Sequence, residues 1–379
     1  MADNSFTVLR QSISVPHGAC ALRAGTSVLG DFGKQLRIVA GRPHKAFLLH
    51  HESADADVLE DLRRQLTDAG FEAELFALAD EGLRRLSQAE VLYNELGNRG
   101  ITSDDALVLF GNAELLAVGL FVGASWCRGM TLAVIPTTLE AATEAVTPEP
   151  LGSAHYADMV SVQGAHPNLI FFNPEVLQDS EETRMRGRAT MVASSMTDSK
   201  EAIERLAGRC QALLDNDVEA LCRQVSDCIK ARGLAVSSSS PNVRQGVNYG
   251  RTFAEGLCAA LGDELAWSAA YAEGLRFESR LGVSVAGNDA DIDVVFAQDG
   301  ILAELGFDEL TLSLSAEELI EHMKQVRFKR SRRFQFSLPL GKGRVRLKAV
   351  EDDLLMEHAR AFCLSRAPRV APTDLYTKE

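Results

Sequence analysis

The chain has 379 residues, 46% of them hydrophobic, and a formal net charge of −14. This length is typical of two domains with sizeable cores, and the negative charge argues against general binding to nucleic acid or to anionic membranes. The seven cysteines are scattered without a CxxC pair, which is typical of reduced thiols. With neither a signal peptide nor an apolar run of about 20 residues, the sequence predicts a cytoplasmic protein that does not span a membrane.

The first half of the chain alternates strand and helix signals. A hairpin is expected before residue 37, followed by strands over residues 46–50 and 71–78 and helices over residues 56–69 and 86–99. Residues 105–139 add a buried strand, a tight turn at Gly111 and Asn112, an apolar helix and a second buried strand. This alternation predicts a parallel sheet that helices cover on both faces.

The second half is mostly helical. After a connecting loop over residues 147–167, we expect a short strand over 169–172 and helices over 181–196, 199–214, 218–231, 250–261, 265–281 and 316–325. Ser315 followed by Glu318 forms a candidate capping box for the last helix. The sequence therefore predicts an α/β fold in two parts: a Rossmann-like parallel-sheet domain over residues 1–175, and an α-helical domain with a C-terminal basic strand over residues 176–379.

Four motifs carry a family resemblance. They are the segment from Gly111 to the Arg-Gly pair ending at Gly129, the PTTL sequence of residues 136–139, the RQGVNYGRTF sequence of residues 244–253, and a basic and apolar strand over residues 333–338. Their order and spacing resemble those of 3-dehydroquinate synthase and the wider sugar-phosphate cyclase family. The resemblance implies a dehydroquinate synthase-like fold and a homodimer. In the family, a cleft between the two domains holds NAD and a divalent metal.

The positions that bind the family's metal are changed in this chain. In the family a glutamate and two histidines bind the metal, usually zinc, and here the resemblance places Thr190, Arg251 and Trp267 at those positions. A further histidine on the substrate side corresponds to Glu255. Carboxylate, imidazole and thiolate groups are the usual zinc ligands. We therefore expect no metal site and no bound zinc.

The family's NAD site is also altered. Its glycine-rich turn reads Gly111, Asn112 and Ala113 here, and the loop that supplies Gly-Gly-Lys in the family reads Pro-Glu-Pro over residues 148–150. We expect no cofactor, with NAD kept as an open alternative. If NAD is retained, the residues that the resemblance assigns to it are Glu81, Arg84, Gly111, Thr137 and Thr138.

A set of anion-binding positions matches the family better. Lys230 stands fourteen residues before Arg244, which is the family's spacing between two side chains that bind substrate anions. Asn248 and Arg128 match positions near a substrate phosphate, and Arg333 or its neighbour Arg332 corresponds to a C-terminal lysine. Lysine, arginine and an asparagine amide recognise carboxylate or phosphate through charge-assisted hydrogen bonds. We therefore expect a small anionic substrate.

Two functions remain open at this stage. The first is a divergent, metal-independent lyase or cyclase of the carbon–oxygen lyase type in a specialised biosynthetic pathway, which works without NAD redox chemistry. In this hypothesis Arg251 polarises the substrate, and Glu255 or Glu144 moves protons. The second is a non-catalytic pseudoenzyme that binds and scaffolds an active homologue. The basic run over residues 324–333 is interpreted as a strand beside the anion site rather than as a nucleic-acid surface.

Overall fold

The computed structural model describes residues 8–42, 44–153, 159–289, 291–341 and 343–368. Its contacts divide the chain into two compact units, the first made of Met1–Ser195 and Arg205–Arg244, the second of Met196–Glu204 and Gln245–Glu379. None of the helices described is both long enough and apolar enough to cross a membrane.

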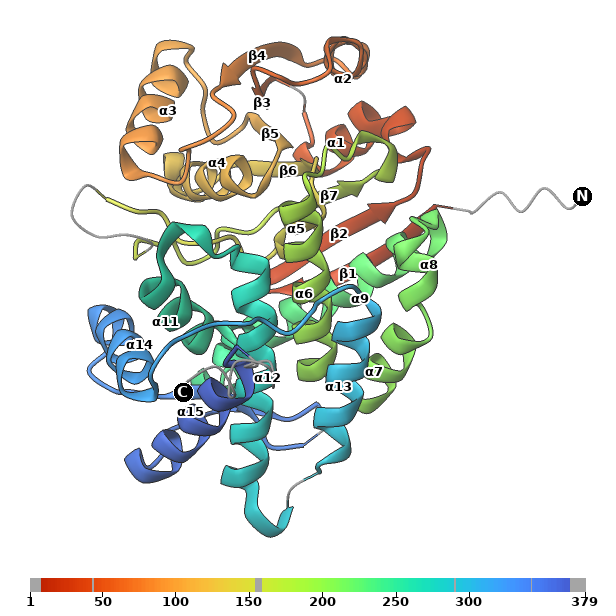
Figure 1. Cartoon of the computed structure of the whole chain (residues 1–379). Helices are drawn as coiled ribbons and strands as arrows, with labels where there is room; N and C mark the ends of the chain where they lie inside the picture. Colours follow the sequence, from red (N-terminus) through yellow and green to blue (C-terminus); the bar gives the residue numbers. More distant parts are fainter. Residues whose placement is uncertain (1–7, 43, 154–158, 290, 342, 369–379) are drawn as a thin grey trace, which may run out of the picture. The chain divides into compact units, whose positions relative to one another are not determined.

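The first unit is built on a seven-stranded sheet with the strand order β1-β2-β7-β6-β5-β3-β4 (Figure 1). The strands are β1 (Leu9–Val15), β2 (Gly18–Ala24), β3 (Lys45–His51), β4 (Glu72–Leu78), β5 (Ala106–Gly111), β6 (Thr131–Pro136) and β7 (Leu169–Phe172). The hairpin of β1 and β2 is antiparallel, and every other pair is parallel. The predicted N-terminal hairpin and parallel sheet are both confirmed.

Helices cover both faces of this sheet because side chains along each strand alternate between the two faces. The helices nearest the strands in sequence are α1 (Phe32–Ala40), α2 (Ala56–Asp68), α3 (Leu86–Asn98) and α4 (Ala113–Ser125). Leu48 and Val108 share a core with α1 and α2. On the other face, a Cβ on Gly119 of α4 would lie 2.3 Å from Leu109, so glycine allows the helix to approach the sheet closely.

The first unit continues beyond the sheet. Its remaining helices are α5 (Leu139–Glu144), most of α6 (Glu181–Asp198), α8 (Cys210–Leu214), α9 (Val218–Ser237) and α10 (Pro241–Arg244), and α7 (Lys200–Ala207) runs from the second unit into the first. Helix α9 packs on β1, where a Cβ on Gly233 would lie 2.3 Å from the carbonyl oxygen of Ser14. Residue 175 therefore marks the end of the sheet, whereas the compact unit extends to Arg244.

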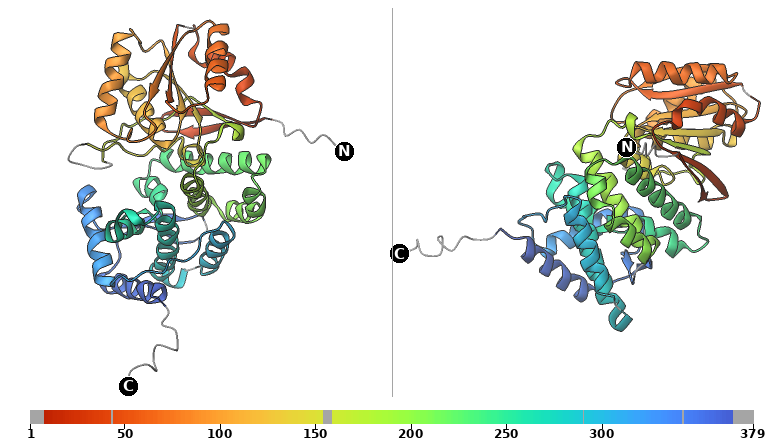
Figure 2. Two further views of the ribbon diagram at one scale, coloured as in Figure 1. Left: turned by 45° about the horizontal axis from the view of Figure 1, so that its top comes forward. Right: turned by 90° about the vertical axis from the view of Figure 1, so that its right-hand side faces the viewer.

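The second unit is helical with one small sheet (Figure 2). Its elements are α11 (Arg251–Leu261), α12 (Trp267–Ala286), α13 (Asp293–Glu304), α14 (Ala316–Arg330), α15 (Asp352–Arg366) and the antiparallel pair β8 (Phe336–Pro339) and β9 (Val345–Lys348). Helix α12 is central to this unit, since it packs against α11, α13, α15 and β8. The predicted architecture, a parallel-sheet α/β part followed by a helical part, is thus confirmed.

Three sequence-based expectations about the elements need correction. The basic run that begins at Lys324 is helical as far as Arg330, so it is not a strand; cations are favourable in the last turn of a helix, and β8 begins only at Phe336. The helix expected over residues 199–214 is two helices, α7 and α8. Helices α1, α5, α13 and α15 were not anticipated.

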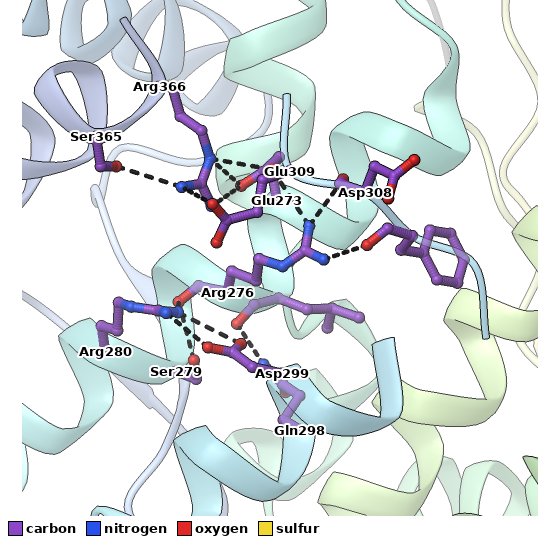
Figure 3. A network of polar contacts seen from close by, with 12 residues as sticks. Glu273, Arg276, Ser279, Arg280, Gln298, Asp299, Asp308, Glu309, Ser365 and Arg366 are labelled. Carbon is purple, nitrogen blue, oxygen red and sulfur yellow. Dashed lines mark hydrogen bonds and ion pairs between the residues drawn. The ribbon is translucent and has the colours of Figure 1, made fainter. Parts of the chain in front are cut away.

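A buried network of charges joins parts of the second unit (Figure 3). Glu273 on α12 is fully buried and binds Arg366 of α15 at 2.9 Å and Arg276 of α12 at 3.2 Å. The same carboxylate accepts a hydrogen bond from the main chain of Leu310 at 3.0 Å, and Arg276 donates to the carbonyl of Phe307 at 2.5 Å. Each buried charge is paired and hydrogen-bonded, as burial requires.

Candidate functional site

The turn between β5 and α4 occupies the place where Rossmann-like folds hold a dinucleotide's pyrophosphate. Here the side-chain oxygen of Asn112 accepts hydrogen bonds from the main-chain N–H groups of Glu114 and Leu115, at 3.0 and 3.1 Å. The N–H of Asn112 itself donates to Nε2 of His51 at 3.2 Å. Three N–H groups at the start of this helix are therefore satisfied within the chain.

The charge at this turn also opposes a phosphate. Glu114 places a carboxylate in the first turn of α4, where it accepts a hydrogen bond from the main chain of Leu83 at 2.9 Å. Gly111 is needed for internal packing, because a Cβ there would lie 2.8 Å from Leu115 and 3.0 Å from His51. A bound pyrophosphate would have to displace the cap of Asn112 and lie beside an acidic first turn. These residues do not fit the pyrophosphate of NAD.

The two threonines assigned to a retained NAD site have structural partners. The hydroxyl of Thr138 accepts a hydrogen bond from the main chain of Ala141 at 3.2 Å and thereby caps α5. The N–H of Thr137 donates to the carbonyl of Gly111 at 2.9 Å, so the ends of β5 and β6 are joined at the carboxyl edge of the sheet. Both side chains are buried.

Glu81 and Arg84 lie in the segment between β4 and α3. Arg84 lies 3.8 Å from the carboxylate of Glu149, in the segment that replaces the family's Gly-Gly-Lys loop, and Glu81 is exposed. Arg84, the cation expected beside NAD, thus lies near Glu149, which stands in the segment where the family has Gly-Gly-Lys.

Glu144 lies in a buried polar cluster of the first unit. It is 6% exposed, and its Oε1 lies 3.6 Å from Arg232 and 3.4 Å from the hydroxyl of Thr190. Arg232, which is 3% exposed, also donates to the hydroxyl of Thr147 at 2.6 Å. The threonine at the metal glutamate's position thus contacts a carboxylate that is already paired with an arginine.

One turn earlier on α5, Glu140 lies in a related environment. Burial raises the pKa of Glu140 to about 7, and the nearby negative charge of Glu144 acts in the same direction. Arg186, whose guanidinium lies 3.1 Å from this carboxylate, opposes the shift. A carboxyl group that titrates near neutral pH is suited to proton transfer. Glu140 was missed in the sequence because burial, which the residue pattern does not specify, causes this shift.

Three of the expected anion-binding cations are exposed in the first unit. Lys230 lies on the exposed side of α9, whereas Arg232, two residues later, points inward. Arg244 ends α10 and donates hydrogen bonds to the carbonyls of Ser238 and Ser239, at 2.8 and 3.1 Å. Arg128 is exposed in the turn before β6 with a φ of 70°. No pocket described for this unit is lined by any of these three side chains.

In the second unit, Arg251 begins α11 and Trp267 begins α12. The guanidinium of Arg251 lies 5.9 Å from the ring centre of Trp267 and 5.8 Å from that of Tyr271, and the two rings are stacked. These contacts are cation–π interactions, which attract the guanidinium to the rings and help to hold it in this position. Arg251 and Trp267, which the resemblance aligns with two metal histidines, thus lie close together in space.

Glu255, the other candidate base, lies one turn further along α11. Its carboxylate binds Arg330 of α14 at 2.7 Å. Behind it, the fully buried Glu278 accepts hydrogen bonds from the main chain of Gly250 and Phe253, at 2.8 and 3.2 Å. Burial raises the pKa of Glu278 to about 8, and the charge of Glu255 adds to this shift.

The last two expected substrate ligands also lie in the second unit. The side-chain amide of Asn248 donates to Oε1 of Gln245 at 2.7 Å. Arg333 is exposed just after α14, where its main-chain N–H donates to the hydroxyl of Ser331 at 3.1 Å. Asn248 and Arg251 therefore stand at the two ends of the short segment that leads into α11, whereas Arg333 belongs to the segment before β8.

The donor set does not fit a catalytic metal. Within the described ranges, no group of three or more histidine, cysteine, aspartate or glutamate side chains is placed to hold a metal ion. A guanidinium and an indole offer no lone pair to zinc, and a guanidinium repels a divalent cation. Unlike histidine, therefore, neither Arg251 nor Trp267 can serve as a metal ligand.

Comparisons with known proteins agree with this fold. A curated 3-dehydroquinate synthase from Mycolicibacterium gilvum is 26% identical over 307 residues, which cover 80% of this chain and 83% of the relative. A second, from Corynebacterium jeikeium, is 26% identical over 335 residues, covering 86% of this chain and 89% of the relative. No protein-family model matches the chain.

A solved structure of 2-deoxy-scyllo-inosose synthase, complexed with carbaglucose-6-phosphate, NAD+ and Co2+, superposes with a TM-score of 0.73 at 15% identity. It covers 93% of this chain and 100% of that one. The chain is thus similar in sequence to 3-dehydroquinate synthases and similar in fold to this solved sugar-phosphate cyclase.

Proposed function

We propose that this chain is a metal-independent lyase or cyclase that acts on a small phosphorylated or carboxylated substrate without NAD redox chemistry. Two curated relatives are named 3-dehydroquinate synthase, which supports an enzyme related to these synthases. Elimination and aldol-type cyclisation need charge stabilisation and proton transfer but no hydride. We place this reaction in a specialised biosynthetic pathway, because the usual synthase reaction needs the metal and NAD sites whose residues are changed in this chain.

The observation that carries this proposal is the position of Arg251. The resemblance aligns Arg251 and Trp267 with two metal histidines of the family. The guanidinium of Arg251 lies against the rings of Trp267 and Tyr271. A cation held in this way stabilises negative charge that develops on a carbonyl or carboxylate oxygen, which is one of the tasks of a metal ion. The anion would be bound by Lys230, Arg244, Asn248, Arg128 and Arg333.

Proton transfer in this proposal falls to Glu255 or Glu144. Both carboxylates are paired with an arginine, Arg330 and Arg232 respectively. Glu140, whose pKa is raised to about 7, is a third group suited to exchanging a proton at neutral pH. The neutralised variant Glu255→Gln should lower turnover more than it weakens substrate binding.

The first experiment measures zinc and NAD in the purified protein and then its thermal shift with phosphorylated ketoses, shikimate-type acids and NAD. We expect sub-stoichiometric zinc, no shift with NAD and a shift with at least one small anion. Arg244→Ala should abolish that shift, whereas Arg223→Ala, which changes an exposed arginine of α9, should preserve it. Stoichiometric zinc at Arg251 and Trp267 would overturn the metal-independent mechanism, and the absence of any anion-induced shift would overturn the substrate class.

A second candidate function rests on the same ion pairs. If Arg330 and Arg232 neutralise Glu255 and Glu144 permanently, the chain is a pseudoenzyme that scaffolds an active homologue. This function predicts that the protein forms a stable complex with an active 3-dehydroquinate synthase in light-scattering measurements and alters its activity. The enzyme hypothesis predicts instead a homodimer that turns over substrate without a partner.

A further inference from the structure

Helix α11, which carries Arg251 in its first turn, begins without a capping side chain of its own. Its N-cap residue is Gly250, which has a φ of 82° and makes no side-chain hydrogen bond. Glycine suits this position, because a Cβ would lie 2.8 Å from Leu275 and 3.0 Å from Tyr271 of α12. The N–H groups at the start of a helix have no partner within the helix, so another part of the chain must satisfy them here.

A single carboxyl group of the neighbouring helix α12 satisfies two of these N–H groups. One oxygen of Glu278 accepts a hydrogen bond from the N–H of Gly250 at 2.8 Å, and the other accepts one from the N–H of Phe253 at 3.2 Å. They belong to the N-cap and to the third residue of the helix, which are the two donors that a capping box satisfies with two side chains of the same segment. Glu278 thus does the work of both side chains of a capping box from outside the helix.

A negative charge is favourable at this place. The N-terminal end of a helix carries a partial positive charge, and α11 has no acidic residue in its first turn. Arg251 adds a full positive charge there, which the rings of Trp267 and Tyr271 attract but do not neutralise. When Glu278 loses its proton, both of its hydrogen bonds become charge-assisted and therefore stronger. The first turn of α11 is then held more firmly.

Several groups determine when Glu278 loses its proton. Burial raises its pKa to about 8, and the charge of Glu255 on α11 adds to the shift, whereas the two main-chain hydrogen bonds and Arg327 of α14 oppose it. Arg330 of α14 is the partner of Glu255. Burial and then the charge of Glu278 raise the pKa of the Tyr249 phenol, which therefore stays neutral in this range.

We propose that Glu278 is a positioning residue, which fixes the first turn of α11 and thereby holds the guanidinium of Arg251 against Trp267 and Tyr271. Arg251 directly follows Gly250, so its side chain leaves the backbone between the two N–H groups that Glu278 binds. The link to turnover rests on the proposed function, in which Arg251 polarises the substrate. The placement of Arg251 does not depend on that function, so it can be tested without substrate.

The test follows the fluorescence of Trp267, which becomes the only tryptophan of the full chain in a Trp126→Phe background. We expect its emission to titrate with a midpoint near pH 8, because ionisation of Glu278 changes how closely the guanidinium of Arg251 lies against the indole. The titration should be lost in Glu278→Gln and retained in Glu317→Gln, a matched change of an exposed glutamate in the same unit. A residue that only supported the fold would leave the emission independent of pH.

A second variant keeps the proposal open to refutation if Glu278→Gln does not fold. Arg251→Met keeps a flexible side chain against the rings but removes the guanidinium, so the titration of Trp267 should lose most of its amplitude. Emission that stays constant across pH 8, or an unchanged titration in either variant, would show that Glu278 does not position Arg251. Because none of these results involves a substrate, the proposed function is judged separately, by its own anion-binding experiment.

Discussion

Replacing Glu273 by glutamine tests whether the buried charge network determines the stability of the second unit. The substitution keeps the shape of the side chain but removes its negative charge. Two buried guanidinium groups, those of Arg276 and Arg366, would lose their common counter-charge (Figure 3). The exposed fractions of the Glu273 and Arg366 side chains are 0% and 7%, so water replaces little of the lost interaction.

Removing one partner of a buried ion pair costs about 3 to 5 kcal/mol when the other charge is left buried. Arg366 would keep Glu309 at 2.9 Å, but the Glu309 side chain is 59% exposed, so water screens that pair. We expect Glu273→Gln to lower the free energy of unfolding of the second unit by that amount. The control is Arg280→Gln, on the same helix, whose pair with Asp299 is partly exposed, at 43% and 26%. An exposed pair contributes less than about 1 kcal/mol, so this control should change stability little.

The assay is hydrogen exchange of amides in α12 and α15 at increasing urea concentration, which reports on the second unit by itself. Glu273→Gln should reduce protection in both helices, and Arg280→Gln should leave it nearly unchanged. If the two variants lose the same stability, or if Glu273→Gln loses less than about 1 kcal/mol, the network is not a determinant of stability and our reasoning is wrong.

Three further predictions concern the second unit. Burial raises the pKa of Glu278 to about 8 in the folded protein, whereas the ordinary value is 4.5. The free energy of unfolding should therefore fall as the pH rises from 4.5 to about 8. In a pH series of urea melts, Glu278→Gln should flatten that part of the curve. Gly274→Ala places a Cβ 2.0 Å from the carbonyl oxygen of Gly250 and should cost about 1 to 3 kcal/mol in a urea melt, whereas Gly300→Ala, with open space around it, should stabilise α13 by up to about 1 kcal/mol. Ser315→Ala removes the cap on Glu318 and should cost about 1 kcal/mol, and Ser315→Asp should restore it.

Much of the fold could be predicted because its signals are local. The buried strand ending at Gly111, the cap at Ser315 and the short strand over residues 169–172 follow from apolar runs and capping residues within a few positions of each other. The end of α14 was missed because a basic run is compatible with both a helix end and an edge strand. Its helical state comes from packing of α14 against α11 and α15, which are distant in the sequence.

The sequence supplied candidate residues for the site but not their partners in the structure. The resemblance located Arg251, Trp267 and Glu255, yet it gave no sign that Arg251 lies against two aromatic rings or that Glu255 binds Arg330. Glu144 was identified, but Arg232 was not, because only the turn of α9 decides that position 232 faces inward while position 230 faces solvent. These partners are set by helix rotation and packing, which one sequence does not specify.

The sequence by itself determined most of the order of elements, the family resemblance, and the residue types at the positions that this resemblance aligns with the family's metal ligands, since these are properties of residue types and their spacing. Only the tertiary structure decided what the replacement residues do. His51 reaches Asn112 across 61 residues of chain, and Arg330 reaches Glu255 across 75. Such contacts depend on the three-dimensional arrangement of strands and helices, because a charge or donor acts over a few ångströms and its partner can come from any part of the chain.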